Sequence, residues 1–119
     1  MVLADTSVWI DHLRAPNQKL TQALLNGHVL IHIHPFISGE LACRNLRNRN
    51  TILRTLNELP LAAVATDTEV LQLIESRKLD GRATGWIDAH LLASARLSQA
   101  PLFTLDKRLH RAASDLGLI

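Results

Sequence analysis

The chain of 119 residues has little of what would assign it quickly to a class. Cys43 is the single cysteine, which excludes an internal disulfide. Aromatic residues make up only 3% of the chain and tyrosine is absent, so base stacking would be a minor part of any contact with nucleic acid. No apolar run approaches the length of a membrane span, and the first one is broken at Asp5. We therefore expect a cytoplasmic protein without a signal peptide or a membrane anchor.

Sequence motifs for nucleotide cofactors and for zinc are also missing. Neither Gly81 nor Gly85 begins a P-loop, because no Lys-Ser or Lys-Thr pair follows them, and no G-x-G-x-x-G follows the first apolar run. His28, His32 and His34 alternate along one apolar segment and could in principle meet at a metal. No cysteine accompanies them, however, and their spacing fits no common zinc site.

Short apolar runs alternate with segments of helical spacing, which is typical of a mostly parallel sheet covered by helices. Strands are expected at 2–4, 29–33, 61–65 and 101–105, with an edge strand at 118–119 as an option. Helices are expected at 7–13, 17–26, 34–46, 50–59, 66–77, 86–99 and 107–115. The length and the hydrophobic fraction of 47% suit one α/β domain over residues 1–119.

Four carboxylates stand where such a fold would bring them together. Asp5 directly follows the first apolar run and Asp106 the last, while Glu40 and Asp88 lie early in helical segments. The carboxyl ends of parallel strands open onto one crevice, which is where open α/β sheets bind ligands. Four acids in one crevice cannot all stay ionised unless a cation joins them. Oxygen ligands suit Mg²⁺ or Mn²⁺, and these metals typically act on phosphate esters.

Each acid also has a purely structural interpretation. Asp5 and Asp106 could cap the helices that follow them, and the helix dipole favours an acid such as Asp88 in a first turn. Glu40 is harder to explain in this way, since it lies among apolar neighbours and a glutamate is rarely buried without a partner. The hypothesis of a metal site depends on the convergence of all four.

Hydroxyl and basic side chains accompany the acids. Thr6 and Thr104 could hold a carboxylate or a metal-bound water, or could simply be β-branched strand residues. The net charge of +2 is small, but without the four acids 13 basic residues face only 7 acidic ones. Arg44, Arg47 and Arg54 recur along one helical face, provided that the helix persists. This face is either solvated or a contact surface for phosphates or for an acidic partner.

Taken together, four segments resemble a PIN-domain ribonuclease, and closely a VapC-type toxin of a VapBC toxin–antitoxin pair. The segments are LADTSVWI at 3–10, ISGEL at 37–41, GWIDAHLLASA at 85–95 and LFTLDKRL at 102–109. They span nearly the whole chain in the order of the family. The resemblance implies a PIN-like three-layer α/β/α sandwich with a central, mostly parallel sheet.

The resemblance also implies a function. Asp5, Glu40, Asp88 and Asp106 would form an acidic quartet that holds Mg²⁺ or Mn²⁺ and hydrolyses RNA, with Asp5 and Asp88 as the firmest ligands. Some family members carry a further acid just after the fourth, where this chain has lysine and arginine. A homodimer is implied as well, and so is a small VapB-type antitoxin chain that occludes the pocket.

Two alternatives stay open at this point. A water activated by a metal needs no 2′-hydroxyl, so the residues alone do not distinguish RNA from DNA, and a nuclease acting on DNA or on flap structures is one alternative. The other is a non-catalytic domain of the same fold that binds RNA or protein. Dependence of the activity on a divalent ion would argue against the second alternative.

Overall fold

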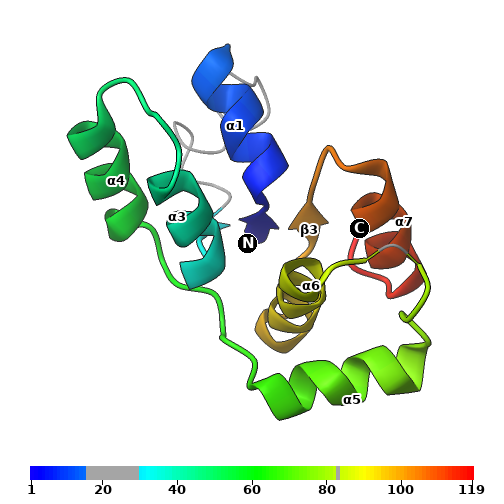
Figure 1. Ribbon diagram of the computed structural model, residues 1–119. Helices are drawn as coiled ribbons and strands as arrows, with labels where there is room; N and C mark the ends of the chain where they lie inside the picture. The colour runs from blue at the N-terminus through cyan, green and yellow to red at the C-terminus, as the bar shows by residue number, and fades with distance from the viewer. Residues whose placement is uncertain (16–29, 83) are drawn as a thin grey trace.

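A computed structural model describes residues 1–15, 30–82 and 84–119 (Figure 1). The predicted helix at 17–26 and His28 lie outside the described residues. The strands are β1 (Val2–Ala4), β2 (Ile31–His32) and β3 (Leu102–Phe103). The helices are α1 (Thr6–Arg14), α3 (Pro35–Ala42), α4 (Arg49–Glu58), α5 (Asp67–Arg77), α6 (Trp86–Ser98) and α7 (Lys107–Asp115). None of the helices in these ranges is long and apolar enough to cross a membrane.

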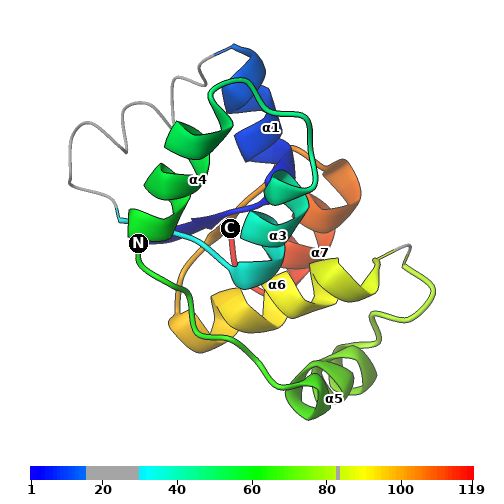
Figure 2. The same ribbon diagram turned by 60° about the vertical axis from the view of Figure 1, so that its left-hand side comes forward.

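The three strands form a parallel sheet in the order β2-β1-β3, and helices surround it (Figures 1 and 2). Leu3 of the central strand pairs with His32 on one side and with Leu102 on the other. Because β1 and β3 run parallel and in register, the residues that follow them emerge side by side at one edge of the sheet. The predicted α/β sandwich with a mostly parallel sheet is confirmed.

The predicted strand at 61–65 is largely wrong. Leu61 makes only an isolated parallel bridge to Ile33, and the backbone at 62–65 joins no strand. The backbone groups of Ala63 that could pair with a further strand are bonded to side chains of α6 instead. Ser98 Oγ accepts from the amide of Ala63 at 2.8 Å, and Ser94 Oγ donates to the carbonyl of Ala63. The optional edge strand at 118–119 is likewise reduced to one bond, from the Leu102 amide to the Leu118 carbonyl at 2.7 Å.

Helix α6 is the central element of the core. Every residue from 89 to 95 is buried, since α6 lies between α5 and β3 (Figure 1). His90 is 2% exposed and packs its ring against those of Phe36 and Trp86, at centroid distances of 4.8 and 4.7 Å. The interpretation of His90 as a packed core residue is therefore correct. His34, also fully buried, has its pKa lowered to about 4, first by burial and then by repulsion from His90.

The predicted arginine face does not exist as one helical face. Helix α3 ends at Ala42 and α4 begins only at Arg49, after Asn48 in a left-handed conformation with φ 53°. The Arg49 guanidinium donates to the carbonyls of Ala42 at 2.5 Å and of Arg44 at 3.0 Å. These bonds satisfy carbonyls at the end of α3 and stabilise the break between the two helices.

Candidate active site

One cavity of about 560 Å³ collects all four predicted acids. They reach it from four places in the chain: the end of β1, helix α3, the first turn of α6 and the start of α7. The lining residues are Asp5, Thr6, Ser7, Glu40, Gly85, Trp86, Ile87, Asp88, Leu91 and Asp106. The convergence on which the metal-site hypothesis depends is thus present in the fold.

Asp5 is the most firmly held of the four acids. Only 5% of the residue is exposed, and both oxygens accept hydrogen bonds. The Ser7 hydroxyl donates to Oδ1 at 2.5 Å and the Thr104 hydroxyl donates to Oδ2 at 2.6 Å. Oδ1 also accepts from the amide of Val8 at 3.3 Å, so the residue caps α1 as well. Asp5 therefore caps α1 and lines the acidic cavity at the same time.

The end of β3 is bonded to the start of α1 through the same two hydroxyls. Thr104 Oγ1 accepts from the amide of Asp106 at 3.1 Å, and Ser7 Oγ accepts from the amide of Leu105 at 3.0 Å. Ser7 was not among the predicted site residues, because its position two residues after Asp5 suggested only a helix cap. Together with the contact of 3.3 Å between the two hydroxyl oxygens, these bonds fix the position of Asp106 relative to Asp5.

Asp106 caps α7 while it lines the cavity. Its Oδ1 accepts from the amides of Arg108 at 2.9 Å and Leu109 at 3.2 Å. Because Oδ2 takes part in no hydrogen bond in the described part of the chain, one oxygen is left for a ligand.

Glu40 is exposed, although its apolar neighbours suggested burial. Ile37 and Leu41 are the residues of α3 that face the core, and Glu40 lies on the side toward the cavity. Its Oε1 accepts from the Thr6 hydroxyl at 2.9 Å. Thr6 thus positions a carboxylate, as one of its two sequence interpretations proposed.

The pKa of Asp88 shows that the acids of the cavity repel one another. Burial raises the pKa of the Asp88 carboxyl above its ordinary value, and repulsion from Asp106, Asp5 and Glu40, in that order, raises it further. A hydrogen bond to the Gly85 backbone acts in the opposite direction. All three other acids are therefore close enough to Asp88 to disfavour its ionised form.

The donor set fits a hard divalent cation. Carboxylate and hydroxyl oxygens line the cavity, and in the described part of the chain no lysine or arginine lines it to neutralise them. Across residues 1–15, 30–82 and 84–119, no three His, Cys, Asp or Glu side chains are already close enough to form a complete metal cage. An ion would therefore have to draw the mutually repelling acids together.

The comparison with known proteins gives the family. The sequence matches the PIN domain over residues 2–115. The chain belongs to the PIN domain family. Two curated relatives carry the name Ribonuclease VapC32, from Mycobacterium tuberculosis strains CDC 1551 / Oshkosh and ATCC 25618 / H37Rv. Each is 42% identical over 119 residues, which covers 99% of this chain and 94% of the relative. The resemblance drawn from the four sequence segments is confirmed.

The arginines predicted to bind phosphate or a partner lie elsewhere in this PIN domain. Arg44 and Arg47, in the connection between α3 and α4, join Arg14 of α1 around a separate cavity of about 230 Å³. Ile10, Leu13, Leu46 and Ile52 supply its apolar walls. Arg54 does not line it. Tertiary packing therefore groups a different set of three arginines from the one that the spacing suggested.

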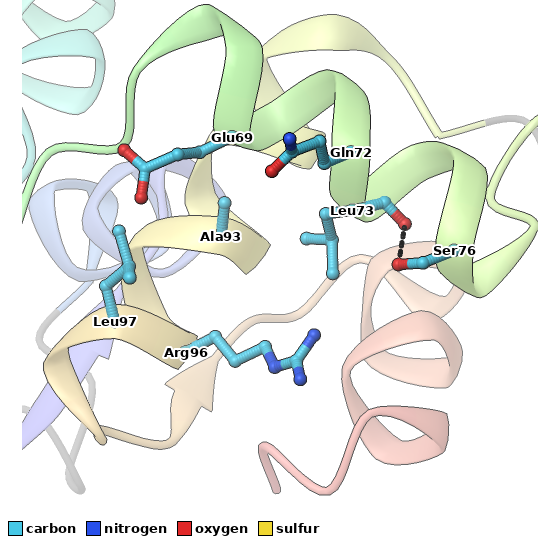
Figure 3. Close-up of a pocket in the computed structure, with 7 residues that line it drawn as sticks. All are labelled: Glu69, Gln72, Leu73, Ser76, Ala93, Arg96 and Leu97. Atoms are coloured by element: carbon cyan, nitrogen blue, oxygen red, sulfur yellow. Dashed lines mark hydrogen bonds between the residues drawn. The ribbon is translucent and has the colours of Figure 1, made fainter.

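A further cavity of about 500 Å³ is lined by α5 and α6 of the PIN domain (Figure 3). Its walls carry Glu69, Gln72 and Ser76 from one helix, and Arg96 and Leu97 from the other. Glu69 is engaged in the capping box of α5, where its Oε1 accepts from the Thr66 amide at 3.0 Å. None of the four clustered acids reaches this cavity, which makes its surface a useful control region.

Proposed function

We propose that this PIN domain is a divalent-metal-dependent endoribonuclease that acts as the toxin of a toxin–antitoxin pair. The observation that carries the proposal is the convergence of Asp5, Glu40 and Asp106 on Asp88 in one cavity, whose described lining residues include no lysine or arginine. The name Ribonuclease VapC32 of relatives that match nearly the full chain supports RNA as the substrate.

The residues of the cavity would have different roles in the hydrolysis of RNA. Asp5 and Asp88 would hold Mg²⁺ or Mn²⁺, with Glu40 and Asp106 as further oxygen donors. When bound, the ion would lower the pKa of a water molecule and polarise the scissile phosphate. Ser7 and Thr104 keep the Asp5 carboxylate in one orientation, so little rearrangement is needed there. Glu40 or Asp106 would orient the attacking water or hold a second ion.

The partners follow from the same proposal. We infer that the protein acts in the cytoplasm on single-stranded RNA, forms a homodimer and is inhibited by a small VapB-type antitoxin that occludes the acidic cavity. The cavity lined by Arg14, Arg44 and Arg47 combines positive charge with apolar walls, which suits an acidic amphipathic segment or the RNA backbone.

Cleavage of a labelled single-stranded RNA tests the function. Activity should require Mg²⁺ or Mn²⁺, stop with chelator, and disappear in Asp5→Asn and in Asp88→Asn, because each change removes a charged ligand while keeping the shape. Asp80→Asn is the matched control, since Asp80 is exposed and outside the cavity. Wild-type activity in Asp88→Asn would defeat the site assignment.

The same assay separates the two alternatives. A preference for branched DNA over single-stranded RNA would favour the DNA or flap nuclease. RNA binding without cleavage at any divalent-ion concentration would favour the non-catalytic binding domain.

A further inference from the structure

A basic cavity of about 530 Å³ runs along α7 next to the acidic one. Its lining includes the ionisable residues Lys107, His110, Arg111 and Asp115, and Thr104 and Leu105 complete one end. Lys107 and Arg111 lie one turn apart on the same face of α7. Both side chains are exposed, and the described residues offer neither of them an ion pair.

The one acid that lines this basic cavity is already neutralised. Asp115 Oδ2 lies 2.6 Å from the Arg82 guanidinium, which donates a hydrogen bond to it. Among the described residues, the positive charges of Lys107 and Arg111 therefore have no ion-pair partner, and they line a cavity large enough for a phosphate group. The N-terminus of α7 does not itself bind the phosphate, because its first amides already donate to Asp106.

The two cavities meet at residues 104–107. The hydroxyl of Thr104 donates to Asp5 in the acidic cavity, while the same residue lines the basic one. Asp106 lines the acidic cavity, and Lys107, the next residue, lines the basic one. If one phosphate of a nucleic-acid strand lies at the acids, a neighbouring phosphate can therefore lie in the basic cavity along α7.

The charge distribution gives this path a physical reason. Four carboxylates repel a polyanion, and a bound ion offsets only part of their charge, so affinity for the strand has to come from cations beside them. Arginine can make a forked contact to a phosphate, and lysine adds a point charge. Leu105, 49% exposed at the end of the basic cavity, offers apolar surface to a ribose or a base.

We propose that Lys107 and Arg111 form a subsite for the backbone phosphate that flanks the scissile phosphate of a single RNA strand. The subsite rests on the proposed function, because the acidic cavity has to be the place of cleavage. It differs from the surface around Arg14, Arg44 and Arg47, which belongs to other elements and to another cavity.

The first test is the salt dependence of RNA binding by the full chain in chelator, where no cleavage occurs. Lys107→Ala/Arg111→Ala should reduce the slope of log affinity against log salt by about 0.7, which is the contribution of one phosphate contact on a single strand. Arg77→Ala/Arg96→Ala removes the same charge from exposed positions on α5 and α6 and should leave the slope nearly unchanged. Lys107→Arg should retain wild-type binding.

The second test locates the contact along the strand. RNAs with a mapped cut position receive one neutral methylphosphonate at a time on either side of the cut. Wild-type affinity should fall at one or two positions beside the cut, and the same replacements should have no further effect in Lys107→Ala/Arg111→Ala. Equal losses in both proteins would overturn the subsite while leaving the ribonuclease intact. If wild-type protein neither binds nor cuts RNA, the proposed function falls and the subsite with it.

Discussion

Replacing Asp88 by asparagine should raise the melting temperature of the metal-free protein at neutral pH. Burial and three neighbouring carboxylates raise the pKa of the Asp88 carboxyl in the folded state. A carboxyl group with a raised folded pKa destabilises the fold at pH values above its unfolded pKa, because the unfolded chain then releases its proton more readily. The penalty grows as the pH rises above the unfolded pKa, and asparagine, which carries no charge, removes it.

The magnitude follows from two opposing contributions. A tenfold change in proton affinity corresponds to about 1.4 kcal/mol. Asparagine also loses a favourable interaction with the helix dipole in the first turn, worth about 0.3–1 kcal/mol. We expect the relief of burial and repulsion to outweigh this loss, and for a chain of this size about 1 kcal/mol of net stabilisation would correspond to a rise of a few degrees in Tm. The gain should fade as the pH falls toward the ordinary value of 3.8, because the folded carboxyl takes up its proton before the unfolded one does.

Thermal unfolding followed by circular dichroism, in chelator and then in millimolar Mn²⁺, measures both halves of the prediction. Mn²⁺ should stabilise the wild type by binding only the folded state, and Asp88→Asn should lose this stabilisation. Asp80→Asn should behave as the wild type in both conditions. An Asp88→Asn protein that melts lower than the wild type in chelator, yet is still protected by Mn²⁺, would show that the four acids do not act as one site.

Two further predictions concern residues outside the acidic cavity. Arg44→Ala/Arg47→Ala should weaken RNA binding, measured by fluorescence anisotropy, and reduce the slope of log affinity against log salt by about 0.7 to 0.9 per lost phosphate contact. An unchanged slope would show that this surface does not bind phosphates and either contacts an acidic partner or is solvated. The pKa of His34 is lowered to about 4, so between pH 6.5 and 4 its ring stays neutral in the folded state while the unfolded chain takes up a proton. The free energy of unfolding of the wild type should therefore fall by up to about 3 kcal/mol as the pH drops from about 6.5 to 4. His34→Asn keeps a capping acceptor for the Phe36 amide, which His34 Nδ1 holds at 3.0 Å, and should flatten the pH dependence in denaturant titrations; an equally steep loss in this variant would assign the acid sensitivity to other groups.

Local signals in the sequence were enough to place most helices of the described part. The pair Thr66 and Glu69 predicts a capping box, and both of its hydrogen bonds are present at the start of α5. The helix predicted at 107–115 has those bounds, because Asp106 supplies a cap that depends only on nearby amides. Caps and helical periodicity act within one or two turns, so they can be recognised without the rest of the fold.

Errors arose where distant residues decide the local backbone. The strand predicted at 61–65 has suitable residues, but Ser94 and Ser98 of α6 hydrogen-bond the backbone of Ala63. The continuous helix that would align Arg44 with Arg54 is interrupted at Asn48, and nothing in the spacing of the arginines reveals this break.

The sequence by itself determined the class of fold, the four acids and their order, because apolar periodicity and residue type are written along the chain. Only the tertiary structure decided that the acids share one cavity and that the Thr104 hydroxyl, 99 positions away, orients Asp5. The tertiary structure also brings Arg82 to Asp115 and thereby leaves Lys107 and Arg111 without an ion-pair partner in the described ranges. The physical reason is the parallel pairing of β1 with β3, which joins the two ends of the chain and places a cap of one helix beside a cap of another.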